Sequence, residues 1–261
     1  PDDWWQAMCL ATRRLLAQSA IEPARVVAMG IAAQMAGAVP VDRDGAPLHN
    51  ALIWLDTRSE PIARRLTGGA VRIGGYGVGA LARWLWRTNG VPNREGRDPT
   101  SKFLWFREVK PDIWPRIHKL LDVKGYLLHR ATGRFAITPD NAHLTWLMDS
   151  RAHRKCWSEA LLDHVGLEAA RLPEIVPATA PVGRLRAEAA AELGLTPETL
   201  VAAGAGDVTA CALGAGRSEP GALHLHIGTS AWWGCHLTGR KVDVLPGIGT
   251  LPAADPERYL L

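Results

Sequence analysis

The sequence predicts an α/β protein. Stretches with helical periodicity alternate along it with short apolar runs that suit buried strands. The chain has 261 residues, of which 47% are hydrophobic and 21% charged, which is ordinary globular usage. A chain of this length can bury the core of one large domain, or of one domain and part of another.

The N-terminal part begins with an expected amphipathic helix over residues 3–20, which Asp2 or Asp3 can cap. Its apolar stripe consists of Trp4, Trp5, Met8, Leu15 and Leu16. The next run, RVVAMGIAAQ, is apolar on both faces and is typical of a buried strand. A strand in AVPVD, an Asp-Gly turn at residues 44–45 and a strand in ALIWLD follow.

The middle of the chain is predicted to be mostly helical. TRSEPIARRL suits a helix capped by Ser59, and residues 68–79 suit a glycine-rich loop. Helical periodicity returns in ALARWLWRTNG, in SKFLWFREVK and in PDIWPRIHKLLDVKGYLLHRATG, where Gly90 and Gly133 are stop signals. A further helix is expected over residues 183–195.

The C-terminal part contains a strand-to-helix junction. TLVAAGAG reads as a buried strand that runs directly into a helix beginning at Asp207. After Pro220 and Gly221, the segment ALHLHIGTS alternates aliphatic residues with histidines, which is typical of a half-exposed strand. A new sheet is therefore expected to begin there.

Charge, cysteine and hydropathy patterns favour a cytoplasmic protein. The 30 basic and 26 acidic residues give a net charge of +4, and the arginines form no basic stripe, so no nucleic-acid partner is expected. The four cysteines form no CxxC pair, which predicts reduced thiols rather than a zinc or redox site. The longest uncharged run, residues 26–41, is too short to span a bilayer comfortably, so no membrane partner is expected either. The chain starts at Pro1 and stops after the strand-like ERYLL, which we interpret as a fragment.

Asp207 is the most informative single residue. It is the one charged residue within LVAAGAGDVTACALGAG, and strand-to-helix junctions of α/β folds form ligand crevices. Its carboxylate can face a substrate there, or it can simply cap its helix, which is worth about 1 kcal/mol. A third interpretation is the dinucleotide motif GxGxxG at Gly204 and Gly206, although Thr209 occupies the third glycine position.

Other residues at strand ends are weaker candidates. Gln34 and Met35 follow one expected strand; Trp54, Asp56 and Arg58 follow another, where the last two can form either an ion pair or a ligand contact. The small residues Gly228, Thr229 and Ser230 close a strand, where backbone N–H groups can approach a phosphate. His224 and His226 with Cys235 and His236 could hold a metal, but surface histidines explain the HxH pattern better, so no metal site is predicted.

Five segments in order resemble the FGGY family of carbohydrate kinases, most closely its xylulokinase-like branch. AMGIAAQMAG is similar to the family's sugar-contacting QMHG segment, DGAPLHNALIWLDTR to its "pLrpailWnDtR" stretch, and LLDVKGYLLHRATGRFAITPDNA to its "KDYLryrLTG…DasdA" stretch. VAAGAGDVTACALGAG resembles the GGGDNAAGALG block, and GALHLHIGTS resembles the phosphate-contacting GTS strand. The resemblance covers nearly the whole chain.

The resemblance implies an actin-like, ribonuclease-H-like fold of two α/β domains with a cleft between them. Residues 1–218 would form the sugar-binding domain without its first phosphate loop, and residues 219–261 would begin the nucleotide-binding domain. The implied activity is the ATP-dependent phosphorylation of a sugar hydroxyl, with Mg²⁺, most closely of a ketopentose such as D-xylulose. The implied partners are the small sugar and ATP, and a homodimer can form.

The resemblance also implies roles for single residues. Asp207 would be the catalytic base that accepts the proton of the sugar hydroxyl as it attacks the γ-phosphate. The implied sugar-pocket residues are Gln34, Met35, Ala36 and Val208, and the implied nucleotide-phosphate contacts are Gly228, Thr229 and Ser230.

Four departures from the family pattern matter. Ala36 stands where a sugar-binding His is usual, Val208 where an amide is usual, and Gly125 replaces the Asp of "KDYL". The opening DxGTT loop is absent, so we expect this chain alone to be inactive. Loss of two polar contacts can change which sugar is accepted. It also leaves open a sugar-binding or sensing homologue without catalysis, and, less favoured, a dinucleotide-dependent oxidoreductase.

Overall fold

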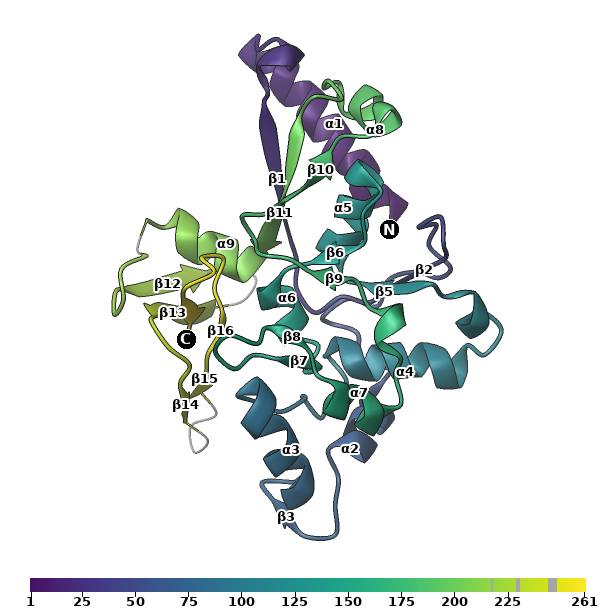
Figure 1. Ribbon diagram of the computed structural model, residues 1–261, viewed down its shortest axis with the longest axis vertical. Coiled ribbons are helices and arrows are strands. Elements are labelled where there is room, and N and C mark those ends of the chain that lie inside the picture. The colour runs from purple at the N-terminus through teal and green to yellow at the C-terminus, as the bar shows by residue number, and fades with distance from the viewer. Residues whose placement is uncertain (217, 229–230, 244–247) are drawn as a thin grey trace.

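The computed structural model describes residues 1–216, 218–228, 231–243 and 248–261, and its central element is a three-stranded sheet (Figure 1). Strands β1 (Ala28–Ala33) and β11 (Leu200–Gly206) run parallel, and β10 (Pro181–Arg184) pairs antiparallel with the far edge of β11. Helix α5 (Val123–Thr132) packs on all three strands, and α1 (Asp2–Ser19) and α8 (Ala187–Leu193) pack beside it. Their apolar faces share one core, which includes Trp5, Ile31, Tyr126 and Val201.

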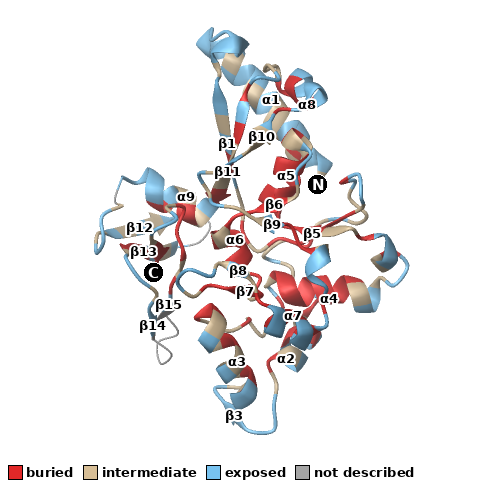
Figure 2. Ribbon diagram, viewed as in Figure 1, coloured by how far each residue is buried: buried red, intermediate tan, exposed pale blue. Residues whose placement is uncertain are grey.

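A second core lies among the helices of the middle segment. It contains the fully buried Trp84 and Phe106 and joins α2 (Glu60–Leu66), α3 (Val78–Thr88), α4 (Pro99–Val109) and α7 (Glu159–Val165). Figure 2 shows buried residues concentrated in α4, α5 and the short helix α6 (Pro139–His143). The short paired strands are β2 (Val39–Val41) with β5 (Lys119–Leu121), β3 (Arg72–Ile73) with β4 (Tyr76–Gly77), β6 (Ala136–Ile137) with β9 (Glu174–Ile175), and β7 (Met148–Asp149) with β8 (Cys156–Trp157). Short 3-10 turns span Pro23–Arg25, Trp114–Arg116 and Ala169–Arg171.

A separate four-stranded sheet follows helix α9 (Asp207–Gly214). Its strands, in spatial order, are β12 (Leu223–Ile227), β13 (Ala231–Leu237), β17 (Tyr259–Leu260) and β16 (Leu251–Pro252). The hairpin of β14 (Val242–Asp243) and β15 (Ile248–Gly249) lies beside it. A new sheet therefore begins where the change to alternating residues predicted one.

Several sequence predictions need correction. The segment 111–133 is not one helical stretch, because β5 pairs with β2 between a 3-10 turn and α5. ALIWLD forms only an isolated bridge, from Leu52 to Ala38. Strand β1 is exposed at alternate positions instead of buried on both faces, because helix α5 covers one face only. Ser59 occupies the predicted N-cap position of α2, but its hydroxyl bonds Gly96 and Ser101 and makes no capping bond. At α1 the expected cap is absent, because Pro1 is the N-cap residue and Asp2 accepts hydrogen bonds from Tyr126 and Arg130.

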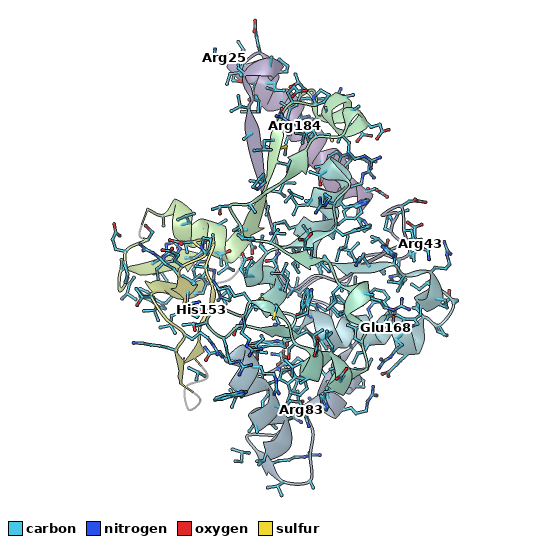
Figure 3. The ribbon with its side chains drawn as sticks, viewed as in Figure 1. Arg25, Arg43, Arg83, His153, Glu168 and Arg184 are labelled. Atoms are coloured by element: carbon cyan, nitrogen blue, oxygen red, sulfur yellow. The ribbon has the colours of Figure 1, made fainter. Side chains whose placement is uncertain are left out.

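The basic side chains are distributed over the surface. Figure 3 labels Arg25 and Arg184 in the upper part of the molecule, Arg43 at the right and Arg83 toward the bottom. Many arginines form local ion pairs, such as Arg184 with Glu198 at 3.0 Å. No helix among the described residues is both long and apolar enough to cross a membrane.

Candidate active site

The site is built where β1 and β11 end side by side. Ala33 lies opposite Gly206 in the parallel register, so the segment after β1 and the start of α9 meet at one sheet edge. Met35 is buried against this junction: a Cβ atom on Gly206 would lie 2.5 Å from Met35 Cγ. The structure thus brings Gln34, Met35 and Asp207 together, as expected for residues that follow neighbouring parallel strands.

Asp207 is the first residue of α9, and Gly206 occupies the N-cap position without a side-chain capping bond. Asp207 therefore does not occupy the N-cap position, although its side chain still meets a first-turn N–H of α9. Its Oδ1 accepts the N–H of Val208 at 2.9 Å, and its side chain remains exposed to solvent. Surrounding protein atoms raise the pKa of Asp207 by desolvation; backbone N–H groups and His226 oppose that shift, while Asp140 adds to it. A partly desolvated carboxylate is a better proton acceptor than a fully hydrated one.

Asp140, on α6, holds the turn at residues 206–209 through buried hydrogen bonds. Its side chain is 1% exposed, and its Oδ2 accepts the N–H of Gly206 at 2.7 Å and the hydroxyl of Thr209 at 2.5 Å. Its Oδ1 accepts the N–H of Asn141 at 2.9 Å and the hydroxyl of Thr138. The bonds to Gly206 and Thr209 lie on either side of Asp207 in the sequence. Asp140 therefore fixes the position of Asp207 through these neighbouring residues. The sequence analysis assigned no role to Asp140. The pattern that could have pointed to it is a single acidic residue within the otherwise uncharged stretch ITPDNA.

More buried polar groups extend this support. Lys124 Nζ donates to the carbonyl of Ala203 in β11 at 3.1 Å and to Thr138, while Asn141 Nδ2 donates to Asp122. Burial lowers the pKa of Lys124 and raises that of Asp122. We call Asp122, Lys124, Thr138, Asp140 and Asn141 the Asp140 network.

Gly125 fits tightly beside this network. A Cβ atom there would lie 2.6 Å from Asp122 Oδ1 and 3.0 Å from the carbonyl of Ala136. The N–H of Gly125 donates to the same Asp122 oxygen at 3.0 Å, which caps α5. In this chain the carboxylate that caps α5 thus stands at position 122, and position 125 has no space for another.

The segment after β1 has an unusual backbone. Ala36 has a φ of 57°, in the left-handed region that side chains rarely adopt. Lys102 Nζ holds it by donating to the carbonyl of Ala36 at 2.9 Å, to that of Ile53 at 2.8 Å, and to that of Arg97. Burial lowers the pKa of Lys102 to about 8, although Asp98 and Asp56 oppose this shift. Lys102 is a second supporting residue that the sequence analysis missed.

The remaining candidates lie in different surroundings. Val208 packs against the apolar cluster of Ala212, Ala253 and Leu260. Gly228 is exposed at the end of β12, whereas Thr229 and Ser230 lie outside the described residues. Asp56 and Arg58 form an ion pair at 2.9 Å, so of the two alternatives for these residues the ion pair is confirmed.

The histidines of β12 do not form a metal centre. His224 and His226 both pack against Trp232, with ring centroids 5.1 Å apart in each pair. Within residues 1–216, 218–228, 231–243 and 248–261, no three His, Cys, Asp or Glu side chains form a metal-binding group. The dinucleotide interpretation is also wrong, because α9 leads into β12 of the other sheet instead of a strand beside β11, and the hydroxyl of Thr209 binds Asp140.

Comparison with known proteins decides the family. Residues 1–214 match the sequence model described as "FGGY family of carbohydrate kinases, N-terminal domain". The chain belongs to this family. The chain is 33% identical over 232 residues to a xylulose kinase of Streptomyces rubiginosus, an alignment that covers 88% of this chain and 44% of the relative. It is 30% identical over 230 residues to a xylulose kinase of Bacillus subtilis, covering 88% of this chain and 43% of the relative.

Solved structures agree with this assignment. A crystal structure titled as a xyloylose kinase from Brucella ovis matches with a TM-score of 0.82 and 28% identity, over 95% of this chain and 48% of that one. The ligand-bound xylulose kinase from Lactobacillus acidophilus matches with a TM-score of 0.82 and 22% identity, over 100% of this chain and 49% of that one. The chain thus has the α/β, actin-like fold of the FGGY family. It spans about half the length of the relatives it matches.

Proposed function

We propose that this chain supplies the sugar-binding part of an ATP-dependent carbohydrate kinase, with Asp207 as the general base. The observation that carries the proposal is the turn at residues 206–209, where buried hydrogen bonds donated to Asp140 hold the exposed carboxylate of Asp207, whose pKa is raised. In this role Asp207 accepts the proton of the attacking sugar hydroxyl as its oxygen forms the new bond to the γ-phosphorus of ATP. The bond from that phosphorus to the β,γ-bridging oxygen breaks, and ADP leaves.

Rigid positioning is what this reaction requires most from the protein, because the phosphoryl group transfers with little covalent assistance. A carboxylate on a fixed turn orients the nucleophile before the phosphate arrives. Magnesium would be bound mainly through the nucleotide phosphates, which leaves the Asp207 carboxylate free as the proton acceptor. We place Gly228 near the nucleotide phosphates, and we propose that residues 219–261 begin the nucleotide-binding domain.

For the substrate we propose a ketopentose such as D-xylulose, supported by the xylulose kinases at 33% and 30% identity. Gln34 and Met35 would line the sugar pocket beside Ala36. The methyl group of Ala36 and the packed side chain of Val208 offer no hydrogen bond to a hydroxyl. A site without those polar contacts should discriminate less sharply among pentuloses and pentitols.

The decisive experiment measures sugar-dependent ADP formation by the complete natural protein that carries this chain, with and without Asp207→Asn. This substitution preserves shape but removes the proton acceptor, so we expect kcat to fall by about a hundredfold or more. Asp163→Asn on α7, an exposed carboxylate on another element, is the matched control and should leave kcat unchanged. Full activity of the Asp207 variant would disprove the assigned role.

The second candidate is sugar binding without phosphoryl transfer, which Ala36 and Val208 favour because both replace polar side chains. The same assay separates the two functions. Binding of a pentulose without ADP or sugar phosphate formation would establish the second candidate, and product formation would exclude it.

A further inference from the structure

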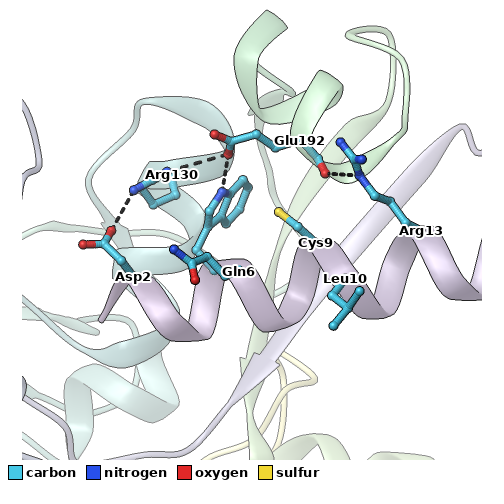
Figure 4. Close-up of a pocket in the computed structure, with 8 residues that line it drawn as sticks. Asp2, Gln6, Cys9, Leu10, Arg13, Arg130 and Glu192 are labelled. Atoms are coloured by element: carbon cyan, nitrogen blue, oxygen red, sulfur yellow. Dashed lines mark hydrogen bonds and ion pairs between the residues drawn. The ribbon is translucent and has the colours of Figure 1, made fainter.

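The chain contains two cavities of similar size in different places. The one drawn in Figure 4 has a volume of about 570 Å³ and lies between α1 and α8. Its polar groups already bind one another: Trp5 Nε1 donates to Glu192, Arg130 donates to Asp2 at 2.8 Å, and Arg13 Nε donates to the carbonyl of Glu192 at 2.7 Å. That cavity therefore offers a ligand little unused hydrogen-bonding capacity.

The other cavity has a volume of about 630 Å³ and lies between α3, the end of α6 and the strands β15 and β16. Its lining includes Tyr76, Asp98, His143 and Trp146, and none of Gln34, Met35, Ala36, Asp207 or Val208. Asn89 closes one side, because its Nδ2 donates to the hydroxyl of Thr250 at 3.0 Å and so ties the end of α3 to the residue between β15 and β16. We call this space the Trp146 cavity.

One buried polar atom in the Trp146 cavity has no hydrogen-bond partner. His143 is 3% exposed, and its Nδ1 is unpaired, whereas the indole N–H of Trp146 faces the carboxylate of Asp98. Buried polar atoms without partners are rare in folded proteins because each has given up its hydrogen bond to water. His143 lines the cavity, which indicates that a polar molecule completes this bond.

Trp146 is held in a costly conformation. Its φ is 58°, its carbonyl accepts the N–H of Trp84 at 3.0 Å, and its ring lies so close to Gly90 that a Cβ there would be 2.4 Å from Cζ3. A bulky residue with positive φ is uncommon and tends to mark sites of function. The surroundings thus fix an indole ring as a rigid wall of the cavity.

The polar groups indicate the chemical class of the ligand. Asp98 accepts the N–H of Asn93 and has its pKa raised by burial to about 6, so it offers a carboxyl acceptor and disfavours an anion. Burial and nearby Arg240, opposed by Asp140, lower the pKa of His143 to about 3, so its ring is neutral. A hydroxyl group can donate to Asp98 or His143 and accept from the indole N–H, which neither an ammonium nor a carboxylate can do.

We propose that the Trp146 cavity binds an uncharged polyhydroxylated molecule of pentose or pentitol size, at a site separate from Asp207. The aromatic rings of Tyr76 and Trp146 and the apolar walls match the C–H face of such a molecule, while its hydroxyls meet Asp98, His143 and Trp146 Nε1. His143 follows Asp140 on the same short helix, so a ligand here contacts the element that holds the Asp207 turn. The proposal does not depend on phosphoryl transfer.

The test is ligand binding to the 261-residue chain, with xylitol and D-xylulose as probes, measured by saturation-transfer NMR and calorimetry. Trp146→Phe keeps a ring but removes the donor, so we expect affinity to fall about fivefold. Asp98→Asn should also weaken binding. Trp86→Phe, which changes an exposed residue of α3 outside the lining, should leave binding unchanged, and the loss caused by Trp146→Phe should be the same in the Asp207→Asn background. D-xylulose 5-phosphate should bind more weakly than D-xylulose, because its phosphate is an anion.

Two results would overturn the proposal. One is the absence of binding to a chain whose circular dichroism and thermal transition show that it is folded. The other is binding that Asp207→Asn abolishes and that Trp146→Phe and Asp98→Asn leave intact, since the sugar would then occupy the Asp207 turn. That second result would support the proposed kinase site while refuting this one, so the two proposals fail separately.

Discussion

The Asp140 network and the sheet of β12 and β13 lie on either side of α9, and they are built in opposite ways. The network is polar and buried, and Asp140 accepts from four donors. The face of β12 that carries Leu223 and Ile227 is apolar and open, with these side chains 67% and 78% exposed. His224 and His226 point to the other face, against Trp232. The segment that precedes α9 therefore supplies the buried hydrogen bonds that hold the Asp207 turn.

The largest expected effect comes from removing the centre of the network. Asp140→Ala would leave the Gly206 N–H and the hydroxyls of Thr138 and Thr209 buried without a partner, and would leave the charge of nearby Lys124 less compensated. We expect a loss of about 3–5 kcal/mol in the free energy of unfolding, measured by urea denaturation. Asp163→Ala should change it by less than about 0.5 kcal/mol. Equal effects of the two substitutions would contradict the role of the network.

The second largest effect is expected at Gly204, where the backbone of β11 lies close to that of β1. Gly204 has a φ of 70°, and a Cβ atom there would lie 2.0 Å from the carbonyl oxygen of Ile31. Gly204→Ala should therefore lower the free energy of unfolding by at least about 1–2 kcal/mol, since the left-handed conformation alone costs that much. Gly214→Ala, near the end of α9, meets no atom within 4 Å and is the matched control, for which equilibrium denaturation should show no loss.

A pH-dependent effect should follow from His143. Its pKa in the folded chain is about 3, below the ordinary 6.5, so between these values the unfolded chain binds a proton that the folded chain does not. Stability should thus fall as pH drops from 6.5 toward 3. Asp98 acts in the opposite direction between about pH 6 and 4, because its raised pKa favours proton uptake by the folded chain. In thermal melts over this range, His143→Gln should lose less stability on acidification than wild type; an equal or steeper loss would contradict this assignment.

The smallest expected effect lies in the open face of β12. Ile227→Thr should change the free energy of unfolding by less than about 0.5 kcal/mol, because the side chain is already exposed. The same change in the other sheet, Val201→Thr, places a hydroxyl at a fully buried position of β11 and should cost about 1–3 kcal/mol. If denaturation shows similar losses for both, the two sheets do not differ as described.

The sequence determined the element types around the site because they follow from local patterns. The strand of TLVAAGAG, the helix that begins at Asp207 and the stop at Gly133 need only periodicity and glycine chemistry, and all three are present. The family could also be recognised from ordered motifs. The sequence could not show which face of β12 is covered. The alternation places Leu and His side chains on opposite faces, but it does not say which of the two faces packs against other residues.

Only the tertiary structure decided what supports Asp207. The hydrogen bonds that Gly206 and Thr209 donate to Asp140 join residues 66 and 69 positions apart, and the bond that Lys102 donates to Ala36 also spans 66 positions. No local sequence pattern predicts such pairs. A buried charged side chain can be recognised as stabilising a distant turn only when its hydrogen-bond partners are known. The same holds for His143, whose unpaired Nδ1 becomes visible only once α3, α6 and β15 enclose a common cavity. The sequence by itself therefore singled out the residue that we propose as the base, and the fold determined how that residue is held.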